Sequence, residues 1–460
     1  MSRPKKISFW GVVILTVVAV DSLRNLPTAA MFGDVLIGYY ILAGVFFLLP
    51  AALVSAELAS RFDDAGGIYS WVKAAFGSKM GVYAVWLQWI ENVIWYPAIL
   101  SFIVATCAYV LVPDLAENTK FLACSILAIF TLMTLLNCRG IMHSVRFSEI
   151  CLWLGLVLPM LCIIGLGCVW YFHHYQHMAL QITPASFLPN IGHTEHIMSI
   201  TAIGLSLCGI EVATVHTKDV ENPKKTFPPA LILSAIIIVF TLILGSLAIA
   251  AVLPQNKISL VAGIMQAFNA FFTAYHLKWL LPFMAIALVI GGLGAVNNWI
   301  IAPARGLMVA AQDHALPKIF THVNRANAPV SILVGQVVVV GGFCLLYLYF
   351  PAVNESYWLL TVLASQLYMV MYAIMFLTCM ILRWMLPIDK QAFSIPGGKL
   401  GCCIVCGMGL IGVGAIFLAG FVPPPTMHFG SHTHYYQLLI TCLVLLSLPP
   451  FLLMRFFGRS

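Results

Sequence analysis

The sequence predicts an all-α membrane protein with twelve transmembrane helices. Of its 460 residues, 62% are hydrophobic and only 8% are Asp, Glu, Lys or Arg, whereas about 25% of residues are charged in soluble domains. The apolar residues gather in runs of about 20, which is the length that a helix needs to cross a bilayer core of about 30 Å with its backbone polar groups paired. No soluble surface can be built from this composition.

No segment between the apolar runs resembles a soluble domain or a linker, which indicates one membrane domain over residues 1–460. The twelve predicted spans lie near residues 8–33, 37–60, 80–112, 118–137, 147–172, 195–217, 227–253, 279–304, 329–349, 355–382, 400–422 and 435–455. The basic start at Arg3 followed by Ile7–Val20 also fits a signal peptide. Because the apolar run continues to Phe32, we expect an uncleaved first span.

The distribution of basic residues predicts that both termini are cytoplasmic. In that orientation 19 of the 23 Lys and Arg residues fall in cytoplasmic segments, and Arg24 lies within a span. The outer segments hold only Lys120, Lys257 and Lys278. This bias follows the positive-inside rule and predicts a multi-pass protein of the cytoplasmic (inner) membrane. The formal net charge of +7 therefore reflects membrane placement and not nucleic-acid binding.

The thirteen cysteines all fall in spans or cytoplasmic segments of this topology, which predicts no disulfide. Cys402, Cys403 and Cys406 crowd the start of the eleventh span, but no further His or Cys stands at zinc-like spacing nearby. We therefore expect them to pack as small apolar residues. The outer loops hold histidines that fit either a metal site or wet loop positions, among them His428, His432 and His434. We expect no metal and no cofactor.

The first span is interrupted at Asp21-Ser22-Leu23-Arg24-Asn25-Leu26-Pro27. Pro27 removes a helix hydrogen bond and clashes with the preceding turn, so a continuous helix is not expected there. A charge at the bilayer centre costs about 2.5–3.5 kcal/mol on insertion scales, so Asp21 and Arg24 should face a polar cavity or each other. Their spacing of three places them on one helix face. Two interpretations stay open: a structural ion pair, or substrate binding by Arg24 and the unwound backbone.

The sixth span is interrupted at Gly204-Leu205-Ser206-Leu207-Cys208-Gly209-Ile210-Glu211. Glycine weakens a helix and lets another backbone or a ligand approach closely. A desolvated Glu211 could exchange protons near neutral pH. Alternatively, it is a structural carboxylate that neighbouring backbone N–H groups or a Trp N–H satisfy. In the third span, Glu91 with Trp95 and Tyr96 is a further candidate for the solute pathway.

The two interruptions occupy corresponding positions if spans one to five and six to ten form two repeats. The repeats would cover residues 1–172 and 195–382, with two peripheral helices over 400–455. Such a pair of interrupted spans is the best sequence pointer to a transporter binding site. The freed N–H groups of a broken helix bind a carboxylate, and its freed carbonyls bind an ammonium group. A zwitterionic amino acid needs both.

Five motifs follow one another along the chain. They are Ser55-Ala56-Glu57-Leu58-Ala59, then Gly66-Gly67-Ile68-Tyr69-Ser70-Trp71-Val72, then Gly209-Ile210-Glu211 leading into Asp219-Val220-Glu221-Asn222-Pro223-Lys224-Lys225-Thr226-Phe227-Pro228, then Trp299-Ile300-Ile301-Ala302-Pro303-Ala304-Arg305-Gly306, and finally Ile395-Pro396-Gly397-Gly398-Lys399. With these five motifs in this order, the chain resembles the amino acid, polyamine and organocation transporter superfamily. Within it, the chain resembles the bacterial glutamate/γ-aminobutyrate exchanger-like branch, from about Ser8 to about Phe457.

This resemblance implies a fold of two inverted five-helix repeats (LeuT-like) plus two peripheral helices. Helices 1 and 6 would be broken at mid-membrane, with substrate held between them. It also implies a secondary active transporter that exchanges an amino acid such as glutamate for a related amino acid or amine by alternating access. A proton-coupled symporter is the main alternative, followed by a channel or a nutrient-sensing receptor on the same scaffold. No Ser/His/Asp, zinc or phosphate-cradling arrangement stands out, so no enzyme is expected.

Carried over by position, the expected substrate-binding residues are Ser22, Leu23, Arg24, Asn25, Cys208, Gly209 and Trp299. The expected coupling or gating residues are Asp21, Glu91 and Glu211. Many members of the superfamily carry a short Gly-Ser-Gly-like run where this chain places the cation Arg24. A fixed cation favours an acidic substrate unless Asp21 neutralises it. The expected partners are an amino acid or amine, protons and the lipid bilayer. Since the chain ends at Ser460, the C-terminal tail gating of that branch is not expected.

Overall fold

The computed structural model of the protein is a bundle of helices. It describes residues 7–62, 67–139, 151–174, 180, 183–187, 194–212, 214, 220–325, 328–350, 352–387, 392–423 and 431–457. The α-helices are α1 (Phe9–Val20), α2 (Leu26–Ala30), α3 (Leu36–Ala43), α4 (Leu49–Arg61), α5 (Ile68–Phe76), α6 (Ser78–Leu111), α7 (Thr119–Cys138), α9 (Leu158–His174), α10 (Thr194–Ser206), α11 (Pro223–Val252), α12 (Gly263–Ala274), α13 (Leu281–Gln312), α14 (Val330–Cys344), α15 (Leu346–Tyr349), α16 (Val353–Met385), α17 (Gly398–Ala419), α18 (His432–Ser447) and α19 (Pro449–Phe457).

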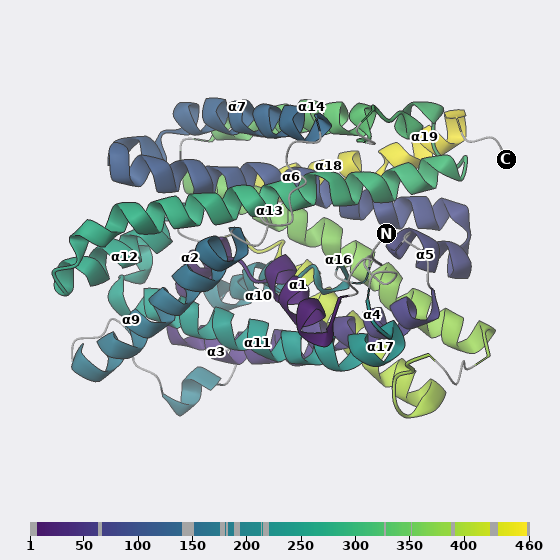
Figure 1. Ribbon diagram of the computed structural model, residues 1–460, viewed down its shortest axis with the longest axis horizontal. Helices are drawn as coiled ribbons and strands as arrows, with labels where there is room; N and C mark the ends of the chain where they lie inside the picture. The colour runs from purple at the N-terminus through teal and green to yellow at the C-terminus, as the bar shows by residue number, and fades with distance from the viewer. Residues whose placement is uncertain are drawn as a thin grey trace, which may run out of the picture.

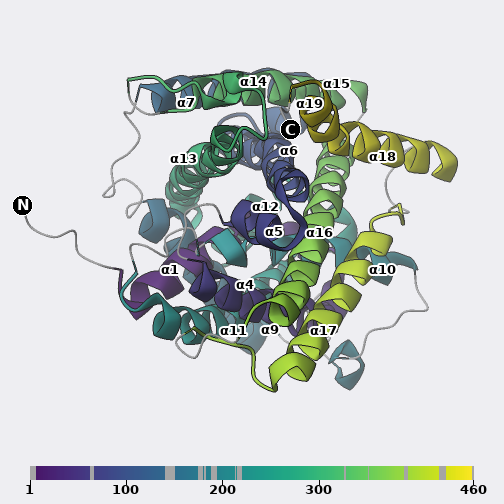
Figure 2. The ribbon, with the colours of Figure 1, turned by 90° about the vertical axis from the view of Figure 1, so that its right-hand side faces the viewer.

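Short 3₁₀ and π segments join or interrupt these helices. They include η1 (Leu23–Asn25), η2 (Gly33–Val35), η3 (Gly44–Leu48), η4 (Pro113–Glu117), η5 (Trp153–Val157), η7 (Pro184–Phe187), η9 (Gln255–Lys257), η10 (Lys278–Leu280) and η11 (Lys318–Thr321). The long helices run side by side along the longest axis of the molecule (Figure 1). Seen along that axis, α7 and α14 lie together on one side of the bundle, and α11 and α17 lie on the opposite side (Figure 2).

Eleven helical segments within the described residues are long and apolar enough to cross a membrane. They match every predicted span except the sixth, where the structure has a shorter apolar segment over Ser199–Val212. Helix α10 stops at the predicted break, and the predicted sixth span, residues 195–217, continues past Val212 beyond the described residues, so the twelfth span stays a prediction. Burial differs along the chain: 89% of the apolar window of Val353–Met385 is buried, against 11% for His432–Arg455. Helix α16 thus lies in the core, and the last span lies at the periphery.

The first span is broken where the sequence predicts it. Helix α1 ends at Val20, and Asp21 and Ser22 adopt extended backbone conformations before η1 begins. Pro27 stands in the first turn of α2, where its missing N–H has no helical partner to lose. A helix running through this position would instead bring the proline ring against the carbonyl of Leu23. The proline therefore separates α1 from α2.

The sixth span is also broken where predicted. Helix α10 ends at Ser206, and Gly209 has φ +106°, a conformation that only glycine adopts without strain. A Cβ on Gly209 would lie 3.5 Å from the carbonyl oxygen of Ala19 and 3.7 Å from the ring of Trp299. The backbone of the sixth-span break therefore packs directly on the end of α1.

A buried ion pair joins α4 to α16. Both side chains of Glu57 and Arg383 are 1% exposed, and Arg383 donates from Nε to Glu57 Oε1 at 2.9 Å and from Nη2 to Oε2. The N–H of Ile395 also donates to Glu57 Oε2, at 2.9 Å. The motif that contains Glu57 therefore fastens two spans and the connection that precedes α17.

An exposed ion pair joins α5 to the end of α13. Lys73 Nζ lies 2.6 Å from Asp313 Oδ2, and the Tyr69 hydroxyl donates to the same oxygen at 2.8 Å. The hydrogen bond from Lys73 lowers the pKa of the Asp313 carboxyl. Since folding lowers this pKa, the stabilisation is present at neutral pH and is lost as the pH falls through the folded-state value.

We predict that Arg383→Met lowers the free energy of unfolding by about 3–5 kcal/mol, because it leaves the Glu57 carboxylate buried without its cation. Lys73→Met is the matched control, since an exposed pair contributes about 0–1 kcal/mol. Thermal and denaturant unfolding in detergent micelles measures both losses. Equal losses in the two variants would show that burial does not set the strength of these pairs.

We predict that Gly155→Ala lowers stability by about 1–3 kcal/mol through overpacking. A Cβ on Gly155 of η5 would lie 2.1 Å from the Cα of Gly291 in α13, so the two segments would have to separate. Gly165→Ala in α9 is the control, because no heavy atom lies within 4 Å of its Cβ position. That change should be neutral or stabilise the helix by up to about 1 kcal/mol. A comparable loss in both variants would argue against a specific glycine contact.

Candidate functional site

Arg24 of η1 is held between aromatic rings. It is 2% exposed, and its guanidinium carbon lies 5.8 Å from the centroid of the Trp95 ring and 5.7 Å from that of Tyr357. These distances suit cation–π attraction, which is strongest where water is excluded. Its Nε has no hydrogen-bond partner within the described part of the chain. The structure therefore buries this cation inside the bundle while its Nε–H donor stays unpaired among the described residues.

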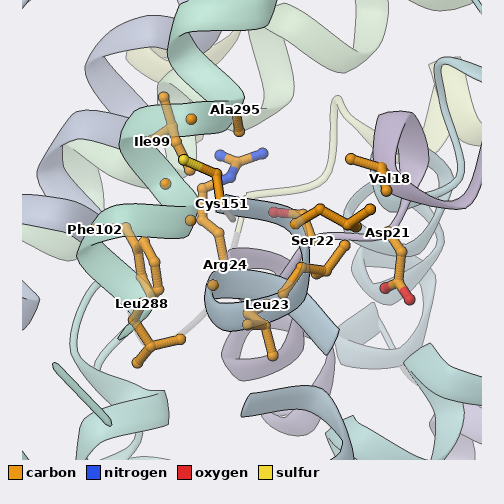
Figure 3. A pocket seen from close by; sticks show the side chains of 16 residues that line it. Val18, Asp21, Ser22, Leu23, Arg24, Ile99, Phe102, Cys151, Leu288 and Ala295 are labelled. Carbon is orange, nitrogen blue, oxygen red and sulfur yellow. The ribbon is translucent and has the colours of Figure 1, made fainter. Parts of the chain in front are cut away.

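Asp21 and Arg24 do not form the ion pair that one interpretation of the sequence proposed. The carboxylate of Asp21 accepts from Thr241 of α11 at 2.8 Å. Figure 3 shows the guanidinium pointing toward Cys151 and Ala295, while the Asp21 carboxylate points away from it. The expectation assumed a helical spacing of three, which holds only in an unbroken helix. The extended backbone at Asp21 and Ser22 turns the two side chains apart.

A small pocket of about 60 Å³ lies beside Arg24. This volume has room for only a few water molecules. Its walls come from the first-span break, α6, the segment around η5, and α13 (Figure 3). Of the predicted binding residues, Ser22, Leu23 and Arg24 line this pocket, together with Asp21. Asn25, Cys208, Gly209 and Trp299 do not line it.

Glu211 is the centre of a buried hydrogen-bond network. It is 3% exposed, and its carboxylate accepts from Tyr368 at 2.7 Å, from Tyr372, and from Gln88 Nε2 at 3.1 Å. The Tyr372 hydroxyl also accepts from the N–H of Gly209, at 2.8 Å. These side-chain partners are phenol and amide groups of α6 and α16. A backbone group at Glu211 also bonds to the carboxyl, as one interpretation of the sequence expected, while the described residues show no Trp N–H as a partner.

Glu91 belongs to the same polar region. It is 3% exposed, and it accepts from Asn92 Nδ2 at 3.2 Å. It lies within electrostatic range of both Glu211 and Arg24. One cation and two carboxylates therefore gather where the two broken spans meet α6. We call Arg24, Glu91 and Glu211 the charged cluster.

Trp299 connects the sixth-span break to α6. Its ring centroid lies 6.2 Å from that of Trp95, whose ring also contacts Arg24. Its carbonyl accepts from the Tyr96 hydroxyl at 2.8 Å. That carbonyl would bond to the N–H four residues later in a regular helix, but Pro303 has none. Trp299 therefore both packs within the helix bundle and lies next to the charged cluster.

The remaining predicted residues have local roles. The Cys208 thiol is buried and donates to the carbonyl of Gly204 at 3.4 Å. Asn25 is half-buried. His432 and His434 are exposed on the first turn of α18, and His428 lies outside the described residues.

Sequence reasoning missed the partners of Glu211, namely Gln88, Tyr368 and Tyr372. The sequence does contain polar groups at helical spacing in two apolar spans. Gln88 stands three residues before Glu91, and Tyr368 and Tyr372 are four residues apart. Nothing in the sequence order indicated that both faces meet Glu211.

We predict that Tyr372→Phe lowers the free energy of unfolding by about 1–3 kcal/mol more than Tyr368→Phe does. Both changes remove one hydrogen bond to Glu211, but only the first also leaves the buried Gly209 N–H unpaired, which costs about 1–3 kcal/mol. Parallel unfolding of the two variants in detergent measures the difference. An equal loss would show that the Gly209 contact contributes nothing.

The family model for amino acid permeases matches residues 7–446. A protein of Legionella pneumophila described as an uncharacterized transporter is 38% identical over 453 residues, which are 98% of this chain and 97% of that protein. A glutamate/gamma-aminobutyrate antiporter of Lactococcus lactis is 30% identical, over 97% of this chain and 90% of its own.

A probable agmatine/putrescine antiporter of Lactococcus lactis is 24% identical, over 70% of this chain and 68% of its own. The helical spans, the two broken helices and the match along nearly the whole chain agree with one another. The chain is a multi-pass membrane transporter, not an enzyme, and it belongs to the amino acid permease family.

Proposed function

We propose that the protein exchanges an acidic amino acid such as glutamate for a related amino acid or amine across the cytoplasmic membrane. The observation that carries this proposal is Arg24, a buried cation whose Nε has no hydrogen-bond partner and which forms no ion pair among the described residues. A substrate carboxylate entering from the adjoining pocket would supply the missing acceptor. The relatives described as antiporters support an exchange mode.

The charged cluster offers each end of an amino acid a partner. The Arg24 guanidinium can bind a carboxylate through two parallel hydrogen bonds. The carboxylates of Glu91 and Glu211 attract an ammonium group or a proton to the same region. The freed backbone of the two breaks adds N–H donors and carbonyl acceptors. Together these groups match a zwitterion with a further negative charge.

The position of Glu211 would allow substrate or proton binding to affect the backbone at the sixth-span break. Through the Tyr372 hydroxyl it is linked to the N–H of Gly209, the residue with positive φ at the sixth-span break. A change in the charge around Glu211 would alter this chain of hydrogen bonds and the geometry of the break. We propose that this link couples substrate or proton binding to alternating access between two inverted repeats, residues 1–172 and 195–382.

Proton-coupled symport is the second candidate function. The neighbouring buried carboxylates of Glu91 and Glu211 favour it, since a proton between them would relieve their repulsion. In this mode the proton gradient replaces internal substrate as the driving force. The two modes therefore differ in what the inside of a vesicle must contain.

Counterflow in liposomes tests the proposal. With unlabelled glutamate inside and labelled glutamate outside, we predict uptake that γ-aminobutyrate competes and that putrescine, which has no carboxylate, does not. Arg24→Gln should lower the ratio of maximal rate to half-saturating concentration by about 10–100-fold, since a hydrogen bond to a charged group contributes about 1.5–3 kcal/mol. Lys120→Gln, which removes an exposed cation at the start of α7, should leave it unchanged.

Three outcomes would redirect or contradict the proposal. Uptake into empty vesicles driven by a pH gradient would replace exchange with proton symport. Full activity of Arg24→Gln with glutamate would remove Arg24 from the substrate site. Absence of flux for any amino acid would contradict the substrate class while leaving the family membership intact.

A further inference from the structure

Three buried cysteines from two helices converge outside the charged cluster. Cys379 of α16 lies 3.8 Å from Cys402 of α17, sulfur to sulfur, and Cys402 lies 3.9 Å from Cys406. All three sulfur atoms lie within 4.8 Å of one another, and each residue is at most 1% exposed. The sequence grouped Cys402 with Cys403 and Cys406 as packing residues. The structure instead leaves the half-buried Cys403 out and adds Cys379.

The sulfur spacing fits a metal ion bound by three thiolates. Zinc binds thiolate sulfur at about 2.3 Å, which puts neighbouring ligand sulfurs about 3.8 Å apart in a tetrahedral site and about 4.0 Å apart in a trigonal one. The two sulfur–sulfur distances of 3.8 and 3.9 Å fall at these values. A disulfide would require about 2.05 Å. The cluster therefore resembles three ligands around one centre more closely than an incipient disulfide.

The charges beside the cluster favour a divalent ion. Cys402 lies within electrostatic range of Arg383 and Arg61. The charge of Arg383 is balanced by Glu57, whereas Nε and Nη1 of Arg61 are buried without a partner in the described residues. Three thiolates around a divalent cation carry one net negative charge, which the charge of Arg61 balances. A monovalent ion would leave a second negative charge uncompensated in a low-dielectric region.

We propose that Cys379, Cys402 and Cys406 form a binding site for a divalent, thiophilic d¹⁰ cation of the zinc type. The ion binds as the three thiols release their protons to solvent, so that M²⁺ and three R–SH groups give M(SR)₃⁻ and three H⁺. No electron is transferred. The bound ion joins α16 to α17 at one helical turn from Arg383.

Metal analysis of the full-length protein tests this site. The protein is expressed in zinc-supplemented medium, purified in detergent, washed with a chelator and analysed by elemental mass spectrometry. We expect about one zinc ion per chain, as for a structural thiolate site. Cys379→Ser, Cys402→Ser and Cys406→Ser should each lose most of it. Cys403→Ser, which changes the neighbouring thiol on the same helix, should keep it.

A second readout keeps the test independent of folding and transport. Protein from cadmium-supplemented cultures should show an ultraviolet thiolate-to-cadmium absorption band in the wild type and in Cys403→Ser, and not in Cys402→Ser. Size-exclusion profiles identify any variant that fails to fold. Metal content well below one equivalent in wild-type protein, equal content in Cys402→Ser and Cys403→Ser, or a disulfide between Cys379 and Cys402 found by differential alkylation would each overturn the proposal.

Discussion

A backbone in lipid has no water to pair with, so each N–H and C=O must find a partner within the protein. The two broken spans and the proline inside α13 depart from the simplest solution, which is an uninterrupted helix, and tyrosine hydroxyls pair with two of the freed backbone groups. Tyr372 accepts from the N–H of Gly209 at the sixth-span break. Tyr96 donates to the carbonyl of Trp299 that Pro303 leaves without a helical partner. The functional region is built around these replacements.

The same constraint governs the charges. The side chains of Glu57 and Arg383 are 1% exposed and form an ion pair with each other. Each charge is therefore balanced within the pair, and the pair fastens α4 to α16. Arg24 is equally buried but rests between the rings of Trp95 and Tyr357, which attract a cation without using its hydrogen-bond donors. The contrast between these two arginines separates a structural cation from the one that we propose binds a carboxylate.

Helix α16 contributes residues that border the charged cluster and residues of the thiol cluster and the buried ion pair. It supplies Tyr357 beside Arg24, Tyr368 and Tyr372 beside Glu211, Cys379 in the thiol cluster, and Arg383 in the buried ion pair. A shift of this helix would therefore act on the charged cluster and on the contact with α17 together. A metal ion on Cys379 would resist such a shift, because it ties α16 to α17. The proposed metal binding at the thiol cluster and the proposed movement at the charged cluster would thus involve the same helix.

The sequence by itself determined the helical membrane class, eleven of the spans and the positions of both breaks. Composition, run length, Pro27 and Gly209 act locally along the chain, so they can be read in sequence order. It also identified Arg24, Glu91 and Glu211 as members of the candidate site. Only the tertiary structure decided which groups these residues meet. Asp21 turns to Thr241 instead of Arg24, Glu211 meets tyrosines of α16, and Cys402 meets Cys379. Such contacts depend on how helices far apart in the chain pack together, and periodicity within one helix carries no information about its neighbours.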